Sequence, residues 1–401
     1  MKRSSSRILT THVGSLVKTP EIIDAMQAQA VGESFDGDAF AQDLRSGVEQ
    51  VVRKQREVGI DVPSDGELGK SSWMGYVWER LDGLELSQRL PRDADWFTMR
   101  NAQFRGFQRA YERVETTMWM PDLPSGKRPE NANILRLFAC TGPIKYKGKA
   151  AIRRDIGNFK TALANYNFAD AFLPVVAPCS CCFPGMNHYY KTEEEFLFAA
   201  AEALHDEYQA IADAGLILQV DDAILPMLYV AGAPGQDLQR YLKWATTCEE
   251  ALNHALRGIP EDRVRYHICW GSQNAPHTWD IPLKDIVNVV LMVKAQAYCI
   301  EAANPRHEHE WQVWENVKLP PGKILIPGVV THSTNVVEHP ELVAWRIENF
   351  ARLVGRDNVM AGTDCGFSQG WNWARVHEEV QWAKLSALGE GAKLASRHLW
   401  N

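Results

Sequence analysis

The chain lacks the excess of positive charge and the long apolar runs that mark two large classes of protein. Its 401 residues carry 43 Lys and Arg against 50 Asp and Glu, which gives a net charge of −7. This balance argues against a nucleic-acid binder, because such proteins are usually basic. The most apolar stretches, such as residues 217–228, are interrupted by Asp221 and Asp222. We therefore expect neither a nucleic-acid partner nor a membrane span.

The start of the chain does not have the residue pattern of a secretion signal. The run MKRSSSRILTTHVGS is charged but has no apolar segment before polar residues resume, so we expect no signal peptide and a cytoplasmic protein. The 8 cysteines are then expected to be reduced, buried or metal-bound. Tryptophan, in contrast, is abundant at 14 residues. Many tryptophans lie in polar surroundings, which indicates pockets or the subunit contacts of a homo-oligomer.

Short apolar runs recur along the chain, and each ends in polar or glycine-bearing residues. They predict strands at 8–13, 60–64, 134–140, 172–177, 216–220, 264–269, 297–302, 324–330 and 358–362. Amphipathic stretches predict helices between some of these strands, at 196–214, 283–296 and 340–354. Gly215 is typical of a helix end, and Pro340 of a first turn. Strands that alternate with helices predict parallel βα units.

The fold that fits this pattern best is an α/β (β/α)₈ TIM barrel. We prefer it to a doubly wound sheet because polar residues follow so many different strands. Nine candidate strands for eight positions mean that one of them is not a barrel strand. Residues 82–133 break the rhythm and end in the Pro-rich MPDLPSGKRPENA, which predicts a rim insertion that acts as a lid or an oligomer contact. No linker or repeat divides the chain, so we expect one catalytic domain over residues 1–401.

Four side chains of the kinds that bind zinc follow apolar runs in the C-terminal third. They are His267 and Cys269 in RYHICWG, Glu301 in YCIEAANP and Cys365 in AGTDCGF. His267 and Cys269 are separated by one residue, so on a strand they face the same side. Glu301 lies 32 positions after Cys269, and Cys365 lies 64 positions after Glu301. These gaps suit one and then two strand-plus-helix units, so all four are expected at one rim as N, S, O and S ligands of zinc.

Two other clusters have residue types that bind metals. Cys179, Cys181 and Cys182 in PCSCCFPG are dense, but neighbouring cysteines on an extended chain alternate between faces. His307 and His309 lie in a charged loop, where such residues are more often solvated or ion-paired. We favour the four-residue set over both clusters.

Several runs resemble the cobalamin-independent methionine synthase family. They are THVGS, HICWGSQNAPH, EAANPRHEHEW, IPGVVTHSTNVVEHPELV and AGTDCGF. The superfamily also holds uroporphyrinogen decarboxylase and epoxyalkane:coenzyme M transferase. The resemblance covers most of the chain outside residues 82–133 and is nearest to a short, single-barrel branch. It implies a core catalytic barrel only, because the full-length enzyme has a second, N-terminal barrel that this chain is too short to include.

The resemblance also implies roles for individual residues. In the family, the residues that match His267, Cys269, Glu301 and Cys365 bind catalytic zinc. Zinc held by two thiolates and a carboxylate is a poor Lewis acid but leaves a bound substrate thiolate nucleophilic, which favours alkyl transfer to sulfur over hydrolysis. We therefore expect a zinc-dependent methyltransferase that acts on a small-molecule thiol such as homocysteine. The sequence does not identify the methyl or alkyl donor, of which a folate is one example.

A thiol such as homocysteine also carries an ammonium and a carboxylate group, and the protein must bind these as well. Glu67 in PSDGELG and Asp221 in LQVDDA follow two further candidate strands. Two carboxylates would suit an ammonium group, and in the family the matching acids bind the amine of homocysteine; we also count Asp221 as catalytic. The alternative for both is a structural ion pair or hydrogen bond at a strand end. Gly14 and Ser15 in THVGS offer backbone N–H groups and a hydroxyl for a carboxylate.

His332 is the candidate proton donor of the reaction. His332 in VVTHSTN could protonate a leaving amine; the family has a histidine near this position, although THST departs from its usual context. The main alternative is addition of a zinc-bound thiolate to an epoxide, as in the coenzyme M transferase. That thiol carries a sulfonate, which calls for a cation such as Lys70 or Arg306. A zinc-storage barrel and a decarboxylase fit the residues less well.

Overall fold

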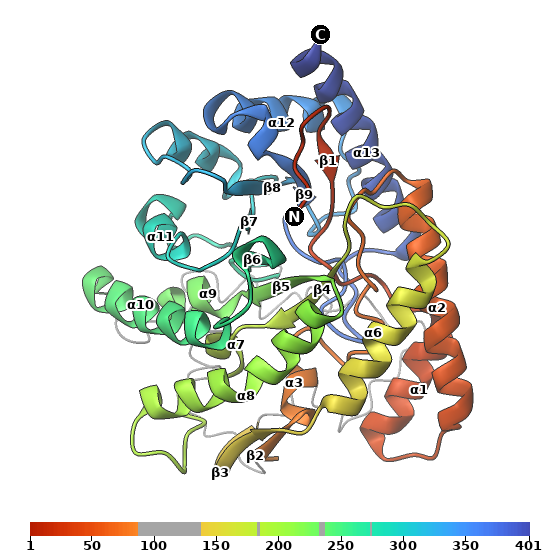
Figure 1. The fold of residues 1–401 in the computed structure, drawn as a ribbon, viewed down its shortest axis with the longest axis vertical. Helices are drawn as coiled ribbons and strands as arrows, with labels where there is room; N and C mark the ends of the chain where they lie inside the picture. Colours follow the sequence, from red (N-terminus) through yellow and green to blue (C-terminus); the bar gives the residue numbers. More distant parts are fainter. Residues whose placement is uncertain (87–137, 183–184, 232–236, 273–274) are drawn as a thin grey trace.

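Seven parallel strands form a curled sheet in the order β1-β9-β8-β7-β6-β5-β4 (Figure 1). The computed structural model describes residues 1–86, 138–182, 185–231, 237–272 and 275–401. The strands are β1 (Leu9–Thr10), β4 (Phe172–Val176), β5 (Ile217–Asp222), β6 (Val264–Ile268), β7 (Ala297–Ile300), β8 (Ile324–Val330) and β9 (Met360–Thr363).

Residues 61–63 take the remaining place between β1 and β4. The Val62 N–H donates to the Thr10 carbonyl, and the Phe172 N–H donates to the Pro63 carbonyl, each at 3.0 Å. Together these bonds join the two edge strands, so the (β/α)₈ barrel prediction is confirmed. The predicted strand at 60–64 is wrong in detail, because it forms only an isolated bridge between Thr11 and Val62. Pro63 has no N–H to donate, which limits regular pairing here.

Helices surround the strands on the outside of the barrel (Figure 1). They are α1 (Pro20–Val31), α2 (Gly37–Glu57), α3 (Gly75–Glu79), α6 (Lys149–Leu163), α7 (Pro178–Cys181), α8 (Glu193–Asp213), α9 (Ile224–Ala231), α10 (Leu238–Ala255), α11 (Leu283–Val290), α12 (Pro340–Val354) and α13 (Glu378–Trp400), with 3₁₀ helices η2 (Glu261–Arg263), η3 (Glu308–Glu315) and η4 (Arg356–Asn358). None of the helices in the described ranges is long and apolar enough to cross a membrane.

The predicted helices are confirmed, with changes of length in two of the three. Helix α12 has the predicted bounds, and α8 begins three residues early because the Thr192 hydroxyl accepts a hydrogen bond from the Glu195 N–H. Gly215 follows α8 with φ of +80°, a backbone conformation that glycine adopts without strain. Helix α11 ends at Val290, short of the predicted residue 296. The Gln296 N–H bonds instead to the carbonyls of Glu261 and Val264.

One predicted strand lies outside the barrel, as the count of nine requires. Strand β3 (Phe138–Tyr146), the described part of the 134–140 prediction, pairs antiparallel with β2 (Leu81–Leu86). The predicted insertion at 82–133 therefore begins within β2. Its residues 87–133 lie outside the described part of the chain.

A buried arginine fixes the end of β1, which carries part of the site. Arg265 on β6 is fully buried and lies with its guanidinium 3.9 Å from the ring centroid of Phe172. Its two terminal nitrogens donate to the Thr11 hydroxyl at 2.9 Å and to the His12 carbonyl at 2.6 Å. These bonds hold the start of the loop that continues to Gly14 and Ser15.

Candidate active site

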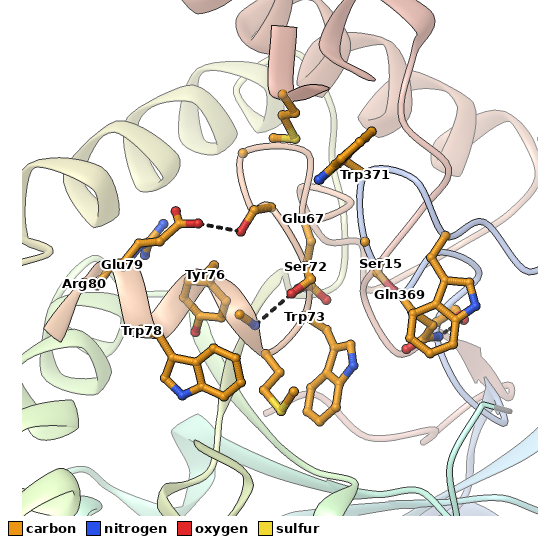
Figure 2. Close-up of a pocket in the computed structure, with 18 of the residues that line it drawn as sticks. Ser15, Glu67, Ser72, Trp73, Tyr76, Trp78, Glu79, Arg80, Gln369 and Trp371 are labelled. Carbon is orange, nitrogen blue, oxygen red and sulfur yellow. Dashed lines mark hydrogen bonds between the residues drawn. The ribbon is translucent and has the colours of Figure 1, made fainter. Parts of the chain in front are cut away.

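A cavity of about 840 Å³ opens at the carboxyl ends of the strands. Loops after β1, β5, β6 and β9 contribute to its wall, together with residues 67–80. Figure 2 shows Ser15, Glu67, Trp73, Gln369 and Trp371 around it. This is the end of a barrel at which enzymes of this fold carry their active sites.

Two thiols meet inside this cavity. Cys269 follows β6 and Cys365 follows β9, and both are buried and line the cavity. They belong to one small buried cluster with Ala223, and each thiol shifts the pKa of the other. The Gly271 N–H donates to the Cys269 sulfur at 3.2 Å, and the Ser272 hydroxyl donates to the Cys365 sulfur at 3.5 Å. The indole of Trp73 packs against this pair.

Glu301 reaches the thiol pair from the end of β7. Its carboxyl group lies close enough to Cys269 to raise the pKa of that thiol. The Trp270 N–H and the Asn304 side-chain amide donate to the two carboxyl oxygens at 3.0 Å and 2.7 Å. Burial raises the pKa of Glu301, and the nearby Asp364 raises it further. Three of the four predicted ligands thus lie near one another at the ends of β6, β7 and β9.

His267 lies on β6 beside the same cavity. Its Nδ1 is 2.9 Å from Asp221 Oδ1, and its Nε2 is 3.3 Å from the Asp364 carbonyl oxygen. Burial alone would lower the pKa of His267, but the bond to Asp221 and the charges of nearby acids raise it to about 9. A carboxylate on one ring nitrogen is the usual arrangement behind a metal-binding histidine, because it fixes the tautomer and the ring orientation.

The pKa values of the two thiols are shifted in opposite directions. The neighbouring Cys269 lowers the pKa of Cys365 to about 7, while the same contact and burial raise the pKa of Cys269 well above its ordinary value. Loss of a proton from this pair is therefore a property of both thiols together. Two sulfurs, a carboxylate and an imidazole are the ligand types that zinc prefers, and zinc binding requires the thiols and the imidazole to lose their protons.

The side chains of the four predicted ligands do not have the geometry of a metal centre in this structure. In the described ranges, no group of three or more His, Cys, Asp and Glu side chains is placed so that it could hold a metal ion. The contacts show where the departure lies, since His267 points one nitrogen at Asp221 and the other at a backbone carbonyl. The residues fit zinc by chemistry and by location, and the metal itself stays a prediction.

The predicted amine-binding residues lie in the same cavity. Glu67 and Asp221 both line it. Glu67 is 3% exposed and has a φ of +55°, a strained conformation for a residue with a side chain. Burial raises the pKa of Glu67 to about 7, although Lys70, at 3.4 Å from its carboxyl group, opposes the shift. The two hydrogen bonds that the Asp221 side chain makes, with His267 and Gln219, both go to Oδ1.

The predicted carboxylate-binding turn packs against Glu67. A Cβ on Gly14 would lie 2.8 Å from the Pro174 side chain and 3.1 Å from Glu67 Oε1. With φ of +137°, Gly14 also has a backbone conformation that other residues rarely adopt. Ser15 is buried and lines the cavity. The structure therefore places Ser15, Glu67 and Asp221 at one cavity, with Gly14 packed against Glu67.

His332 is placed behind the rim. It is buried, does not line the cavity, and its Nε2 is 2.9 Å from the Ser272 hydroxyl. Its Nδ1 is buried without a hydrogen-bond partner among the described residues. Burial, with the nearby Arg375 and His267, lowers the pKa of His332 well below its ordinary value. In this position the residue reaches Cys365 only through Ser272.

The remaining candidates have structural contacts. His307 bonds to Glu310 at 2.8 Å and to Asp280 at 3.2 Å, so the ion-paired interpretation of its loop is confirmed for this residue. Cys179 and Cys181 are buried in α7 and do not line the cavity. Among the described residues all cysteines are free thiols.

Sequence reasoning missed several residues of the rim. Asn304 orients Glu301, and Asp364 accepts from the N–H groups of Ala302 and Ala303, each at 2.8 Å. Both lie within four residues of a predicted ligand, which was the available signal. No such signal marks Trp73, because it is far in the sequence from Cys269 and Cys365 and meets them only in the folded chain.

The barrel and its rim define a (β/α)₈-type protein with thiols, an imidazole and carboxylates in one cavity. The chain matches the family described as "Cobalamin-independent synthase, Catalytic domain" over residues 8–91 and 179–385. It belongs to this family.

Individual relatives are distant in sequence. Protein YxjH of Bacillus subtilis, described as uncharacterized, is 24% identical over 96% of this chain and 93% of its own length. A 5-methyltetrahydropteroyltriglutamate–homocysteine methyltransferase of Acidithiobacillus ferrooxidans is 23% identical, and the match covers 92% of this chain but 39% of that protein. The structure of a B12-independent methionine synthase from Shewanella sp. W3-18-1 has the same fold, with a TM-score of 0.70, 17% identity, and coverage of 98% of this chain and 99% of that one.

Proposed function

We propose that the protein transfers a methyl group to a small-molecule thiol such as homocysteine, with zinc at the rim. The observation that carries the proposal is that Cys269 and Cys365 pack together in a cavity that also holds His267, Glu67 and Asp221, with the Glu301 carboxyl group close enough to shift the pKa of Cys269. The names of relatives in this family support it, since they include methionine synthases and homocysteine methyltransferases.

One set of residues would bind the thiol of the acceptor, and a second set would bind its ammonium and carboxylate groups. Zinc, when bound by His267, Cys269, Glu301 and Cys365, would hold a substrate thiol in its thiolate form. Glu67 and Asp221 would bind the ammonium group, and the Gly14–Ser15 turn would bind the carboxylate. The thiolate sulfur then forms a bond to the methyl carbon while the bond between that carbon and the donor breaks. The donor leaves with the electron pair.

The cavity favours this acceptor over a thiol held by the cations predicted for a sulfonate. Lys70 is buried and lies 3.4 Å from Glu67, so its charge is already paired. Arg306 is exposed and does not line the cavity. Neither predicted cation is therefore placed for the acid group of a thiol that adds to an epoxide.

Metal analysis of the purified protein tests the foundation of the proposal. We expect about one zinc per chain, as for a single four-ligand site, and a large loss of zinc in Cys269→Ala and in Cys365→Ala. Cys248→Ala is the matched control, because Cys248 is an equally buried cysteine in α10 that does not line the cavity. Full zinc retention in both rim variants would remove the proposed centre.

A further inference from the structure

Gln219 is a buried glutamine inside the barrel, one layer below the cavity. It lies on β5 two residues before Asp221, so the two side chains point to the same face of the sheet. Ile217, two residues earlier, belongs to an apolar cluster to which β1, β4, β7, β8 and β9 also contribute, so this face is the barrel interior. Gln219 is fully buried and does not line the cavity, whereas Asp221 does. Gln219 is therefore placed to act on a ligand only through its neighbours.

The side-chain amide of Gln219 uses both of its hydrogens. Its Nε2 donates to Asp221 Oδ1 at 2.7 Å and to the Val13 carbonyl oxygen. A carbonyl oxygen can only accept, so the nitrogen of the amide and not its oxygen must face Val13. The amide oxygen Oε1 is buried with no hydrogen-bond partner among the described residues. The two donated bonds are thus the polar contacts that orient this side chain.

These bonds decide which oxygen of Asp221 faces the cavity. Oδ1 accepts from Gln219 and also lies 2.9 Å from His267 Nδ1. A carboxylate with one oxygen held by two groups cannot turn without breaking both contacts. The second oxygen, Oδ2, makes neither bond and is left for a ligand in the cavity that Asp221 lines. A carboxylate oxygen fixed in this way suits a charged donor such as an ammonium group.

Gln219 also links Asp221 to the segment after β1. It is paired in register with Arg265 on β6. The Arg265 guanidinium donates to the His12 carbonyl, and Gln219 holds the carbonyl of the next residue, Val13. Two consecutive carbonyls are therefore held from one layer of the barrel interior. Because Gln219 bonds to both Val13 and Asp221, the end of β5 and the segment after β1 keep a fixed relation to each other.

We propose that Gln219 is a positioning residue that fixes the Asp221 carboxylate for the ammonium group of the thiol acceptor. This inference rests on the proposed function, because that function assigns the ammonium contact to Asp221. It adds a determinant of specificity for amino-bearing thiols that lies outside the cavity wall. Methionine at position 219 would fill nearly the same space but donate nothing. Asp221 Oδ1 would then keep only the contact with His267, and the carboxylate would be free to turn.

Calorimetric titration of zinc-loaded Gln219→Met with two thiols tests the proposal. Homocysteine carries the ammonium group and 4-mercaptobutyrate is the same molecule without it, so the ratio of their affinities measures the ammonium contact. We expect this ratio to fall about tenfold, as for one hydrogen bond to a charged group, while 4-mercaptobutyrate binds within about twofold of its wild-type affinity. A residue that only supports packing would weaken both thiols alike. An unchanged ratio would overturn the proposal.

A double-mutant cycle shows whether Gln219 acts through Asp221. In an Asp221→Ala background the carboxylate is gone, so Gln219→Met should change the affinity ratio by less than about twofold. A tenfold fall in both backgrounds would mean that Gln219 acts independently of Asp221, which contradicts the positioning role. If Gln219→Met does not fold, Gln219→Asn takes its place in the cycle. It keeps the amide but is one carbon shorter, so it cannot make both bonds, and the same pattern is expected.

Gln381→Met is the matched control for the loss of a buried glutamine. Gln381 on α13 is also fully buried, its Oε1 accepts from the Val17 N–H at 2.8 Å, and it does not line the cavity. Both substitutions should lower the free energy of unfolding, since each leaves a backbone group without its partner. Only Gln219→Met should change the affinity ratio. An equal change in Gln381→Met would assign the effect to lost stability and end the proposal.

Crystal structures separate this inference from the proposed function. If the wild-type protein binds neither thiol, the proposed function fails, and the orientation of Asp221 is then read directly. In the metal-free protein we expect Gln219→Met to turn the Asp221 carboxylate away from its wild-type orientation. A carboxylate with the same orientation in both proteins would show that Gln219 does not position it.

Discussion

At the scale of single residues, the charge of Glu67 should control recognition of an amino-bearing thiol. Burial raises the pKa of Glu67 to about 7. The carboxyl group is therefore largely neutral below that pH and charged above it. We expect homocysteine to bind more tightly as the pH rises, by up to about tenfold per unit below the pKa, with a plateau above it. Calorimetric titrations from about pH 6 to about pH 8 measure this slope.

The control removes the contributions of the thiol and of His267. The acid 4-mercaptobutyrate lacks the amine of homocysteine, so the ratio of the two affinities isolates the ammonium contact. Glu67→Gln should flatten the pH dependence of that ratio and lower it to its value in the acid range. A ratio with the same slope in Glu67→Gln and in the wild type would contradict the role of Glu67.

The residues that could be predicted are those whose chemistry and position are both local. His267 and Cys269 share a face of one strand, and Glu301 and Cys365 each follow another strand, so a barrel must bring them near one another. The contact of Trp73 with the thiol cluster could not be predicted, because nothing in the run KSSWMGY says that this segment reaches the end of β6. Partners of that kind come from distant segments and become visible only in the folded chain.

At the scale of elements, the protonated His307 should stabilise the contact between η3 and the loop before α11 by its ion pairs with Glu310 and Asp280. Burial alone would lower its pKa, but Asp280 and Glu310 raise the pKa of His307 from 6.5 to about 10. A raised pKa means stability that is full below pH 6.5 and is lost as the pH rises towards about 10. His307→Gln should cost on the order of 2 kcal/mol near pH 6, and much less near pH 10.

Urea unfolding at several pH values measures this difference. His309 is the matched control, because it lies in the same segment but is exposed. His309→Gln should change the free energy of unfolding by less than about 0.5 kcal/mol at every pH. A cost of His307→Gln that does not fall with rising pH would show that packing against Trp270, with ring centroids 4.2 Å apart, outweighs the ion pairs.

The elements themselves could be predicted where pattern and capping agree. Helix α12 begins at Pro340 and ends at Val354, as its periodicity and first-turn proline indicate. The segment at 60–64 has the apolar run of a strand, yet it is held by a few bonds to β1 and β4. The difference arises because Pro63 lacks an N–H, and because Asp61 uses its side chain to accept from the Thr10 N–H at 3.0 Å.

At the scale of the whole molecule, the predicted zinc would tie together the ends of strands that lie apart in the sheet. The four ligands come from β6, from the end of β7, and from the loop after β9, with β8 between the last two. A ligand that binds only the folded barrel stabilises it by mass action. Zinc at about a hundred times its Kd should therefore add ~2.7 kcal/mol to the free energy of unfolding.

The measurement compares thermal unfolding of the chelator-treated and zinc-loaded protein. We expect a rise of a few degrees in the unfolding midpoint of the wild type and almost none in Cys365→Ala, which loses a ligand. Cys248→Ala, a cavity-forming change elsewhere in the core, should lower the midpoint in both states but keep the rise. If zinc raised the midpoint of Cys365→Ala as much as that of the wild type, the metal would bind elsewhere, and the thiol pair would be a structural contact between β6 and β9.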